Sequence, residues 1–325
     1  MTSLRVLCAA VIGAVLMASP TPAASQAWPT RSIQLISPFS AGNANDIVAR
    51  VVLDHVSRQL NQTIVIENRP GGGGTIGAAM VAKAEPDGYT ILLHSSSLSS
   101  QVVLHKSLPF DAARDFAPVI LFGIQPSVLV SAPSKGFKTV ADLVAAAKAK
   151  PGALNFASAG IGSASHMAAE RLRLAAGIKV QHIPFRGPVE AFTEVMAGRI
   201  DYYFLPIAPA LPVIGDGKVM ALAVSTPKRA PLLPNVPTTA EAGYPDASYI
   251  FWGGLSAPAK TPPDIVNKLH DETQKALNLP VVQERLAKLG VQPMPMSVEQ
   301  FQKFVRDDLA ATLKLAHDIG IVPTN

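Results

Sequence analysis

The glycine-rich stretch of residues 72–77 is the first motif in the chain that could support chemistry. Gly72, Gly74 and Gly77 have the G-x-G-x-x-G spacing that binds a dinucleotide pyrophosphate when it lies between a strand and a helix. The next β-branched run, however, ends in serines and a histidine rather than in an acidic residue that would hold a ribose, and Pro70 interrupts the turn. We therefore interpret these glycines as a loop in which backbone approaches backbone, and we expect no cofactor.

Serine and histidine side chains suggest a second chemistry, nucleophilic or metal-assisted catalysis. Ser165 and His166 are adjacent in sequence, but the members of a catalytic triad meet in space, and no G-x-S-x-G turn surrounds them. The seven histidines lack H-x-H and H-E-x-x-H spacing, and the single cysteine, Cys8, cannot complete a zinc site. We expect neither a catalytic nor a metal site. An exported hydrolase or nucleotide-dependent enzyme that uses these serine, histidine or glycine loops is the alternative function.

Two loops rich in small and hydroxyl residues each precede an expected helix. The first begins the stretch PFSAGNANDIVAR, residues 38–50, and the second is ASAGIGSASH, residues 157–166. Helix N-termini carry unpaired N–H groups and a partial positive charge, so such loops can hold a carboxylate or phosphate. Ordinary capping by serine would explain them equally well. In the first loop we expect Asn43 as the N-cap, with Asp46 in the capping-box position and paired with Arg50.

The elements that position these loops alternate between β-branched runs and helical patterns. From Trp28 the order is strand, helix, strand, helix, strand, which is typical of a parallel sheet covered by helices. A second α/β unit follows PSVLVSAP, and the last part, from Pro263, is amphipathic helix. The stretch FWGGLSAP, residues 251–258, repeats the Ser-Ala-Pro of residues 131–133. In such sheets the strand-to-helix loops gather at the carboxyl ends of the strands, where ligands bind.

The stretches PSVLVSAP and FWGGLSAP mark the two points at which we expect the chain to cross between domains. The chain would leave the first domain, build the second and return to the first. Residues 28–128 and 250–325 would form the first domain, and residues 129–249 the second. A hinge of two strands and a ligand cleft between the domains would follow. Two domains in series are the alternative, but the last helices would then have no sheet of their own to cover.

The first 27 residues have the composition of a cleaved secretory signal. Arg5 precedes an apolar run of residues 6–18, and a stretch of small residues ends at Ala27. The apolar run is shorter than the roughly 20 residues that cross a membrane. The exported chain would begin at Trp28 and contain no cysteine. The full chain's net charge of +5 is spread over helices rather than clustered, so we expect no nucleic-acid partner.

Five motifs, in order, resemble the landmarks of the Bug family of extracytoplasmic solute receptors, which serve tripartite tricarboxylate transporters. They are PFSAGNANDIVAR, ENRPGGGGTIGA followed by AEPDGYT, LPFDAARDFAPV, HIPFRG and VPTTAEAGYP, and they span essentially the whole chain after residue 27. The resemblance implies an α/β type II periplasmic binding protein of the Venus-flytrap kind, with two hinge-crossing strands. Such a protein closes over a small organic carboxylate in the periplasm, without catalysis, and delivers it to the transporter's membrane components. We expect a monomer.

Carried over position by position, the resemblance implies ligand contacts from both domains. They are Phe39, Ser40, Ala41, Gly42, Asn43 and Asp46 in the first loop, Ser96 after the third strand, Ser158, Ala159, Gly160, Gly162, Ser163 and His166 in the second loop, and Arg186 and Leu205 beyond it. Arg186 either is a charge on the surface or binds the ligand carboxylate through two parallel hydrogen bonds. Asn43 either caps its helix or touches the ligand.

Three positions depart from the family pattern. Ser40 replaces the usual second proline, Asn43 replaces the second glycine, and Phe204-Leu205-Pro206 stands where many members have Phe-Asp-Asn. Without that acid, a ligand ammonium in a dry cleft would lack a charged partner. We therefore expect an amine-free carboxylate, with an aromatic or otherwise apolar body or a second carboxylate. A sensor that presents its bound ligand to a signalling receptor is a further alternative.

Overall fold

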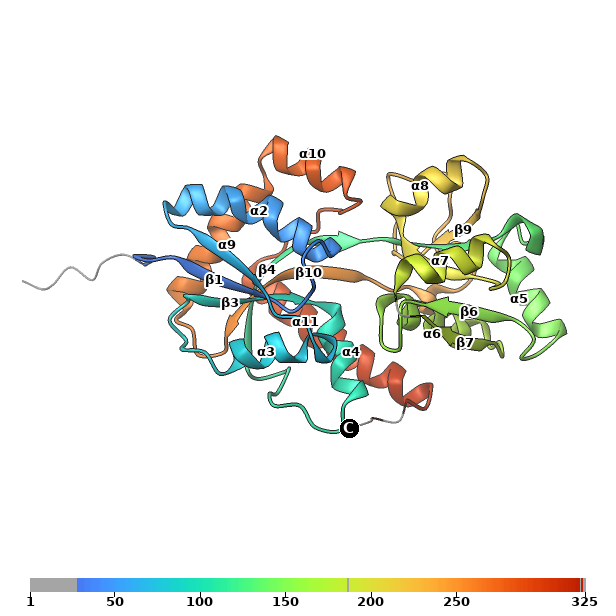
Figure 1. Ribbon diagram of the computed structural model, residues 1–325, viewed down its shortest axis with the longest axis horizontal. Coiled ribbons are helices and arrows are strands. Elements are labelled where there is room, and N and C mark those ends of the chain that lie inside the picture. The colour runs from blue at the N-terminus through green and yellow to red at the C-terminus, as the bar shows by residue number, and fades with distance from the viewer. Residues whose placement is uncertain (1–27, 186, 322, 324–325) are drawn as a thin grey trace, which may run out of the picture. The chain divides into compact units, whose positions relative to one another are not determined.

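The computed structural model describes residues 28–185, 187–321 and 323, which Figure 1 draws in colour. The expected signal sequence and Arg186 lie outside these residues. Contacts group the described residues from Arg31 onward into one compact unit. The elements described below all belong to the unit that begins at Arg31.

The first sheet has five strands in the order β2, β1, β3, β10, β4. Their bounds are β1 Ile33–Ser37, β2 Ile64–Asn68, β3 Thr90–Ser95, β4 Phe116–Gln125 and β10 Phe251–Pro258. β1 pairs in parallel with β2 and β3, whereas β10 runs antiparallel to both of its neighbours. The predicted parallel sheet is therefore confirmed for β1 to β3, whereas β10, whose direction the sequence did not predict, adds an antiparallel strand. β10 comes directly from the second part of the chain. The connection contains no crossover helix of the kind that usually joins parallel strands.

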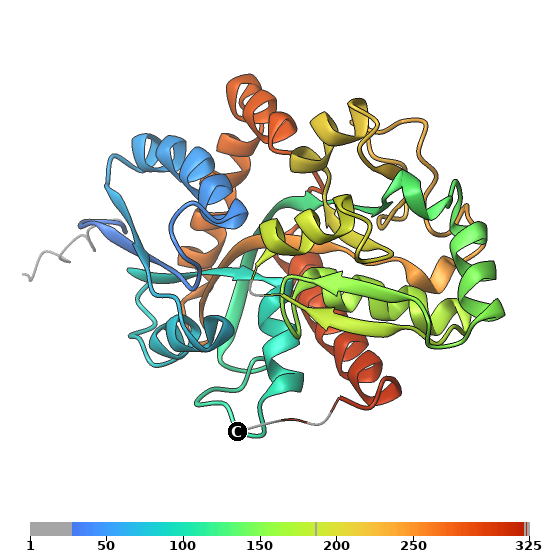
Figure 2. The ribbon, with the colours of Figure 1, turned by 45° about the vertical axis from the view of Figure 1, so that its right-hand side comes forward.

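Helices pack against this sheet through their apolar residues. Their bounds are α2 Ala44–Leu60, η1 Gly72–Gly74, α3 Thr75–Ala82, α4 Ser96–Leu104, α9 Pro263–Leu277, α10 Pro280–Lys288 and α11 Val298–Asp318. α2 and α9 lie side by side, as Figure 1 and Figure 2 show. Leu35 of β1, Leu92 of β3 and Val52 of α2 are fully buried, which is expected where apolar positions recur at the strand and helix periods.

A second group of strands occupies the middle of the chain. β5 Ser127–Ser131, β8 Tyr203–Pro206 and β9 Met220–Val224 form an antiparallel sheet in the order β8, β5, β9. β6 Asn155–Ser158 and β7 Gln181–Pro184 form a parallel pair. The other elements are η2 Pro133–Lys135, α5 Val140–Ala149, α6 Ala164–Ala176, α7 Pro188–Met196, α8 Ile207–Gly215 and η3 Pro245–Ala247. The expected alternation is confirmed. Helix α8 was not expected, because it contains Pro209 and Pro212.

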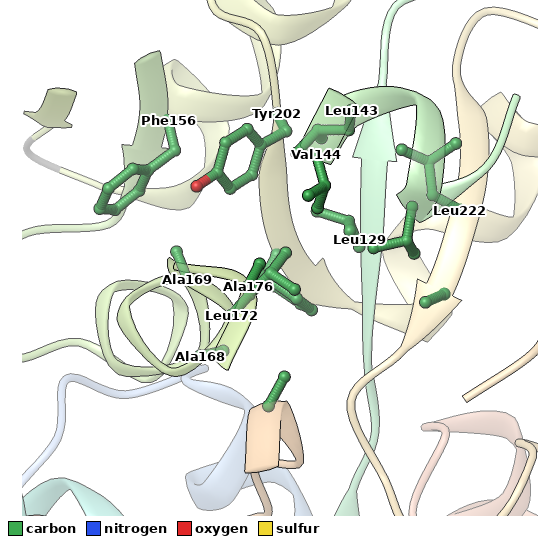
Figure 3. Packing of buried hydrophobic residues seen from close by; sticks show 14 of the residues in the cluster. Leu129, Leu143, Val144, Phe156, Ala168, Ala169, Leu172, Ala176, Tyr202 and Leu222 are labelled. Atoms are coloured by element: carbon green, nitrogen blue, oxygen red, sulfur yellow. The ribbon is translucent and has the colours of Figure 1, made fainter. Parts of the chain in front are cut away.

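The second group has an apolar core built from its strands and from α5 and α6 (Figure 3). Phe156 and Tyr202 lie on one side of this core, and Leu172 of α6 packs among them. Leu315, near the end of α11, belongs to the same cluster. Phe301, near the start of α11, belongs instead to a cluster with Trp252 of β10. One helix of 21 residues, about 30 Å long, therefore contributes to the cores of both groups.

The chain passes between the two groups twice, and the two passages lie side by side. The first passage runs from β4 through Pro126 into β5. The second follows β9 and ends at β10, where Phe251 pairs with Gln125. Between them, Tyr249 N–H donates to Ser225 O at 2.8 Å, and Ser225 N–H donates to Ser127 O at 2.8 Å. The predicted pair of connecting segments is thus present, while hinge motion at this place stays a prediction. Among the described helices, none is both long enough and apolar enough to cross a membrane.

Candidate functional site

The first loop, residues 38–46, joins the end of β1 to the start of α2. Asn43 is the N-cap of α2, as predicted, and its Oδ1 accepts a hydrogen bond from Asn45 N–H at 3.0 Å. Asp46 accepts from Gly42 N–H at 3.0 Å and not from the N–H of Asn43. The predicted capping box is therefore wrong, because Asp46 accepts from Gly42 and not from the N-cap residue Asn43. Asn43 N–H already donates to Ser40 O at 3.1 Å, so Asp46 reaches one residue further back.

Asp46 is the centre of a hydrogen-bond network that fixes the shape of the first loop. Arg50 Nε lies 2.9 Å from Asp46 Oδ2, which confirms the predicted pair. Asn68 Nδ2, at the end of β2, donates to Asp46 Oδ1 at 2.8 Å and to Phe39 O at 3.0 Å. Burial alone would raise the pKa of Asp46, but the hydrogen bonds from Arg50, Gly42 N–H and Asn68 hold that pKa below its usual value. The Asp46 carboxylate is thus occupied by hydrogen bonds that hold the first loop in place.

The N-terminus of α2 keeps backbone donors that face no acceptor of the protein. No hydrogen bond among the described residues uses the N–H of Ala44 or Asp46. Ala44 is exposed, whereas Asp46 is fully covered, so of the two the Ala44 N–H is the one open to a ligand in this conformation. These groups add to the partial positive charge at the start of a 17-residue helix. Ser40 and Ala41 are exposed beside them, and Phe39 is half-buried. The first loop can therefore accept a carboxylate or phosphate through backbone groups and the Ser40 hydroxyl.

A small apolar pocket lies at the carboxyl ends of β1 and β3. It is lined by Pro38, Phe39, Gly74, Ala78, Leu92, Leu93, His94, Ser95, Ser97 and Leu98. Its volume of about 10 Å³ would hold no more than about one water molecule. Ser95 caps α4 by accepting from Ser97 N–H at 3.2 Å. Ser96, which the resemblance implied as a contact, is buried and does not line the pocket. Ser97 does line it. The direction of each side chain in the first turn of α4 decides which serine faces the pocket.

The second loop, residues 157–166, satisfies several of its own backbone donors. Ala159 N–H donates to Ser165 Oγ at 3.0 Å, Gly160 N–H to Ser158 Oγ at 3.1 Å, and Gly162 N–H to His166 Nδ1 at 3.1 Å. These groups are therefore not open to a ligand in this conformation. The N–H groups of Ile161 and Ala164 make no hydrogen bond within the described part of the chain. Ser163 is the N-cap of α6 and accepts from His166 N–H.

Two histidines support the second loop from beneath. The rings of His166 and His182 stack with centroids 4.0 Å apart, and Phe156 stacks on His182 at 4.8 Å. Burial lowers the pKa of His166 to about 3, helped by His182 and Arg173, and burial lowers the pKa of His182 to about 4. Both rings are therefore neutral at pH 7, and His166 can accept the Gly162 hydrogen bond. His182 was not among the predicted site residues, since it meets His166 only through the pairing of β6 with β7.

Part of the second loop touches the first group of elements directly. Gly162 has φ +75, and a Cβ built there would lie 2.2 Å from Leu104 Cδ1, at the end of α4. A residue with a side chain at this position would meet both a strained backbone and a steric clash. Gly162 therefore allows the second loop and α4 to approach each other.

The two remaining predicted contacts are Leu205, which is buried, and Arg186, which the structure does not describe. Leu205 on β8 is only 3% exposed and belongs to an apolar cluster with Val128 and Tyr203. Its side chain is covered by the protein, so a direct ligand contact is not supported in this conformation. Arg186 lies outside the described residues, and its predicted role stays open.

The enzyme alternatives find little support in this geometry. Ser158 Oγ lies 2.6 Å from His182 Nε2, but Ser158 is fully buried and also bonds Gly160. Among the described residues no cluster of His, Asp, Glu or Cys could hold a metal ion. The glycine-rich stretch packs backbone to backbone, as predicted, because a Cβ at Gly77 would lie 3.1 Å from Arg69 O and from Pro38 Cα.

Two α/β groups joined by adjacent crossing segments, with strand-to-helix loops at the strand ends, define a periplasmic binding protein of type II. The model of the "tripartite tricarboxylate transporter family receptor" matches residues 48–321. The chain therefore belongs to this receptor family, which includes the Bug proteins.

Individual relatives agree over nearly the whole chain. BugT of Bordetella pertussis is 33% identical over 315 residues, which cover 96% of this chain and 97% of BugT. The structure of R. palustris Rpa4515 with adipate has 31% identity and a TM-score of 0.79, and the likeness covers 91% of this chain and all of that one. MatC from Rhodopseudomonas palustris with bound malate has 31% identity and a TM-score of 0.75, and covers 89% of this chain and all of that one.

Proposed function

We propose that the protein is a non-enzymatic receptor that captures a small, amine-free organic carboxylate and delivers it to the membrane components of a tripartite tricarboxylate transporter. The observation that carries this proposal is the first loop, where α2 begins with an unused N–H group at the exposed residue Ala44. An anion is favoured there by both the backbone donors and the helix dipole. The Ser40 hydroxyl supplies a further donor.

Capture requires two domains that close over the ligand. Residues 28–128 and 250–325 would form one domain and residues 129–249 the other, hinged at the two passages of the chain. The second loop would cover the ligand with Ile161, whose side chain is 61% exposed. Closure requires only that the ligand binds the closed state more tightly than the open one.

The ligand class follows from what the two loops offer. Rpa4515 and MatC hold adipate and malate, which are dicarboxylates without an amine. In this chain neither Leu205, whose side chain packs in an apolar cluster, nor Pro206 supplies an acid that could pair with a ligand ammonium. A buried ammonium without such a partner is costly, so we infer that dicarboxylates or apolar monocarboxylates bind better than amino acids.

The receptor would act in the periplasm after export. Residues 1–27 have the pattern of a cleaved signal sequence, and family membership supports an extracytoplasmic role. N-terminal sequencing of protein secreted by a bacterial host tests the location of the cleavage site. A chain recovered with residues 1–27 intact would contradict this part of the proposal.

A thermal-shift screen tests the receptor function. The panel contains adipate, malate, succinate and benzoate, with aspartate, glutamate and a nucleotide as controls. A ligand at 100 times its Kd stabilises the folded protein by about 2.7 kcal/mol, which raises the melting midpoint by several degrees. NMR spectra of the same mixtures test for turnover. The proposal fails if no carboxylate raises the midpoint, or if an ester or nucleotide is consumed.

A further inference from the structure

Asn45, in the first turn of α2, has a side chain that contacts both strands of the sheet that lead to the second group. It is only 1% exposed, although it follows the exposed residues Asn43 and Ala44. Its Oδ1 accepts a hydrogen bond from Gln125 Nε2 at 2.8 Å. Gln125 is the last residue of β4, directly before Pro126 carries the chain toward the second group. Asn45 therefore connects the first loop with the first passage.

The return passage meets the same amide. A Cβ built on Gly253 of β10 would lie 2.5 Å from Asn45 Oδ1 and 3.0 Å from Asn45 Cγ. The missing side chain at Gly253 thus leaves the space that Asn45 occupies. β4 and β10, here called the crossing strands, both contact the amide of one residue.

The crossing strands are irregular at this place. Gly253 pairs with Gly123, but Gly254 pairs with Leu121, so the register shifts between the two glycines. Such a bulge bends a strand and interrupts its ladder, which makes it a natural place for flexion. Asn45 packs against the bulge from the side of the first loop.

The amide also keeps one unused donor. Asn45 Nδ2 is buried and has no hydrogen-bond partner within the described residues. A buried donor without an acceptor is unfavourable, so the present position of Asn45 is not the best that its chemistry allows. A small change of the first turn or of the hinge angle could give it an acceptor.

We propose that Asn45 is the positioning residue that couples the carboxylate loop to the crossing strands. The N–H group of Ala44, which would bind the carboxylate, belongs to the residue directly before it. Any adjustment of that turn to a ligand moves the Asn45 amide against Gln125 and Gly253, and any swing of the hinge moves the turn. The link to ligand binding rests on the proposed receptor function, whereas the link between Asn45 and the hinge does not.

The experiment measures the distance between the two groups in the ligand-free protein. Spin labels are attached at Lys83→Cys, after α3, and Lys148→Cys, on α5, in a Cys8→Ser background; both lysines are exposed. Gln125→Met removes the donor to Asn45 but keeps the length of the side chain. Gly253→Ala pushes a methyl group into the Asn45 amide, and Asn45→Ala removes the amide.

We expect Gln125→Met and Gly253→Ala to shift or broaden the distance distribution. In the Asn45→Ala background, Gly253→Ala should have little further effect, because the clashing atoms are gone. Asn68→Leu is the matched control: it also removes an amide that holds the first loop, but from β2, which does not cross. It should leave the distance unchanged. Should Gly253→Ala fail to fold, Gln125→Met still gives the answer.

Two results would overturn the proposal. One is a Gln125→Met distribution that coincides with that of the wild type. The other is a Gly253→Ala effect that persists undiminished in the Asn45→Ala background. Titration with adipate is the second arm, in which Gln125→Met should raise the Kd about fivefold, mainly through faster dissociation. If adipate does not bind the wild type, that result counts against adipate as a ligand and leaves the distance measurements to decide on Asn45.

Discussion

The imidazole rings of His166 and His182 are stacked with their centroids 4.0 Å apart, directly beneath the second loop. Glu170 lies 3.9 Å from His166 Nε2 on the other side, and Arg173 pairs with that carboxylate. Burial lowers the pKa of His166 from 6.5 to about 3. The loop conformation therefore depends on a neutral His166.

The pH dependence of stability follows from this lowered pKa. Between about pH 6.5 and pH 3 the unfolded chain binds a proton at this histidine and the folded chain does not, so the free energy of unfolding falls as the pH is lowered. Each such histidine contributes a slope of up to about 1.4 kcal/mol per pH unit. His182, whose pKa burial lowers to about 4, and His94 on β3, whose pKa burial lowers to about 3, add further contributions.

His166→Asn tests this origin. Asparagine can accept the Gly162 hydrogen bond without titrating, so the variant should lose stability less steeply between pH 6 and pH 4. Urea unfolding at several pH values measures the slope. If the wild type and the variant have the same slope, protonation of His166 is not involved.

Replacing Asp46 should weaken the first loop more than an equivalent change on the surface. Asp46→Asn removes the charge that binds Arg50 and the N–H of Gly42, and the side chain is fully covered. We expect a loss of about 2 kcal/mol at pH 7. Because the pKa of Asp46 is lowered, the difference from wild type should shrink as the pH falls below 3.8, the ordinary value for this carboxyl.

Asp54→Asn is the matched control for that change. Asp54 pairs with Arg58 one turn further along α2 with the same i,i+4 spacing, but both side chains are more than half exposed. Its loss should stay within about 0.5 kcal/mol. Equal losses from the two variants in urea unfolding would show that burial of Asp46 has no energetic role.

Gly162 should tolerate alanine less well than a glycine of similar conformation in open space. Gly162→Ala combines a positive φ with a clash against Leu104, and we expect a loss of about 3 kcal/mol. Gly152→Ala has φ +80 and nothing within 4 Å, so it should lose only about 1 kcal/mol. Adding Leu104→Ala should recover part of the first loss and none of the second. A Gly162→Ala variant as stable as Gly152→Ala would mean that the loop and α4 are not in close contact.

We predict that the protein binds amine-free dicarboxylates more tightly than amino acids. Succinate and aspartate differ by one amino group, so the ratio of their Kd values isolates its effect. With Leu205 and Pro206 in place of an acid, we expect succinate or another amine-free dicarboxylate to bind at least about tenfold more tightly, equivalent to about 1.4 kcal/mol. Tighter binding of aspartate than of any amine-free acid contradicts the predicted class.

The start of the fold could be predicted well because local chemistry decides it. The alternation of β1 and α2, the cap at Asn43 and the pair Asp46 and Arg50 all depend on residues close in sequence. The close packing of the glycine stretch follows similarly from its composition.

Other features depend on distant contacts that no local pattern reports. The stack of His166 on His182 requires the register of β6 on β7. The role of Asn45 requires Gly253, which arrives from more than half the chain away. Helix α8 was missed because its prolines suggest a loop, although Pro209 falls in its first turn. The amphipathic pattern of α11 indicates an apolar face but not that it contacts two cores.

Amide NMR of the labelled protein during titration with adipate, malate and succinate tests carboxylate capture at the first loop most directly. We predict saturable shifts, with the largest change at the N–H group of Ala44 and with the acid recovered unaltered. Signals of residues 38–46 that stay unchanged with every acid of the panel, or a bound acid that shifts only amides elsewhere, would contradict the proposed receptor site.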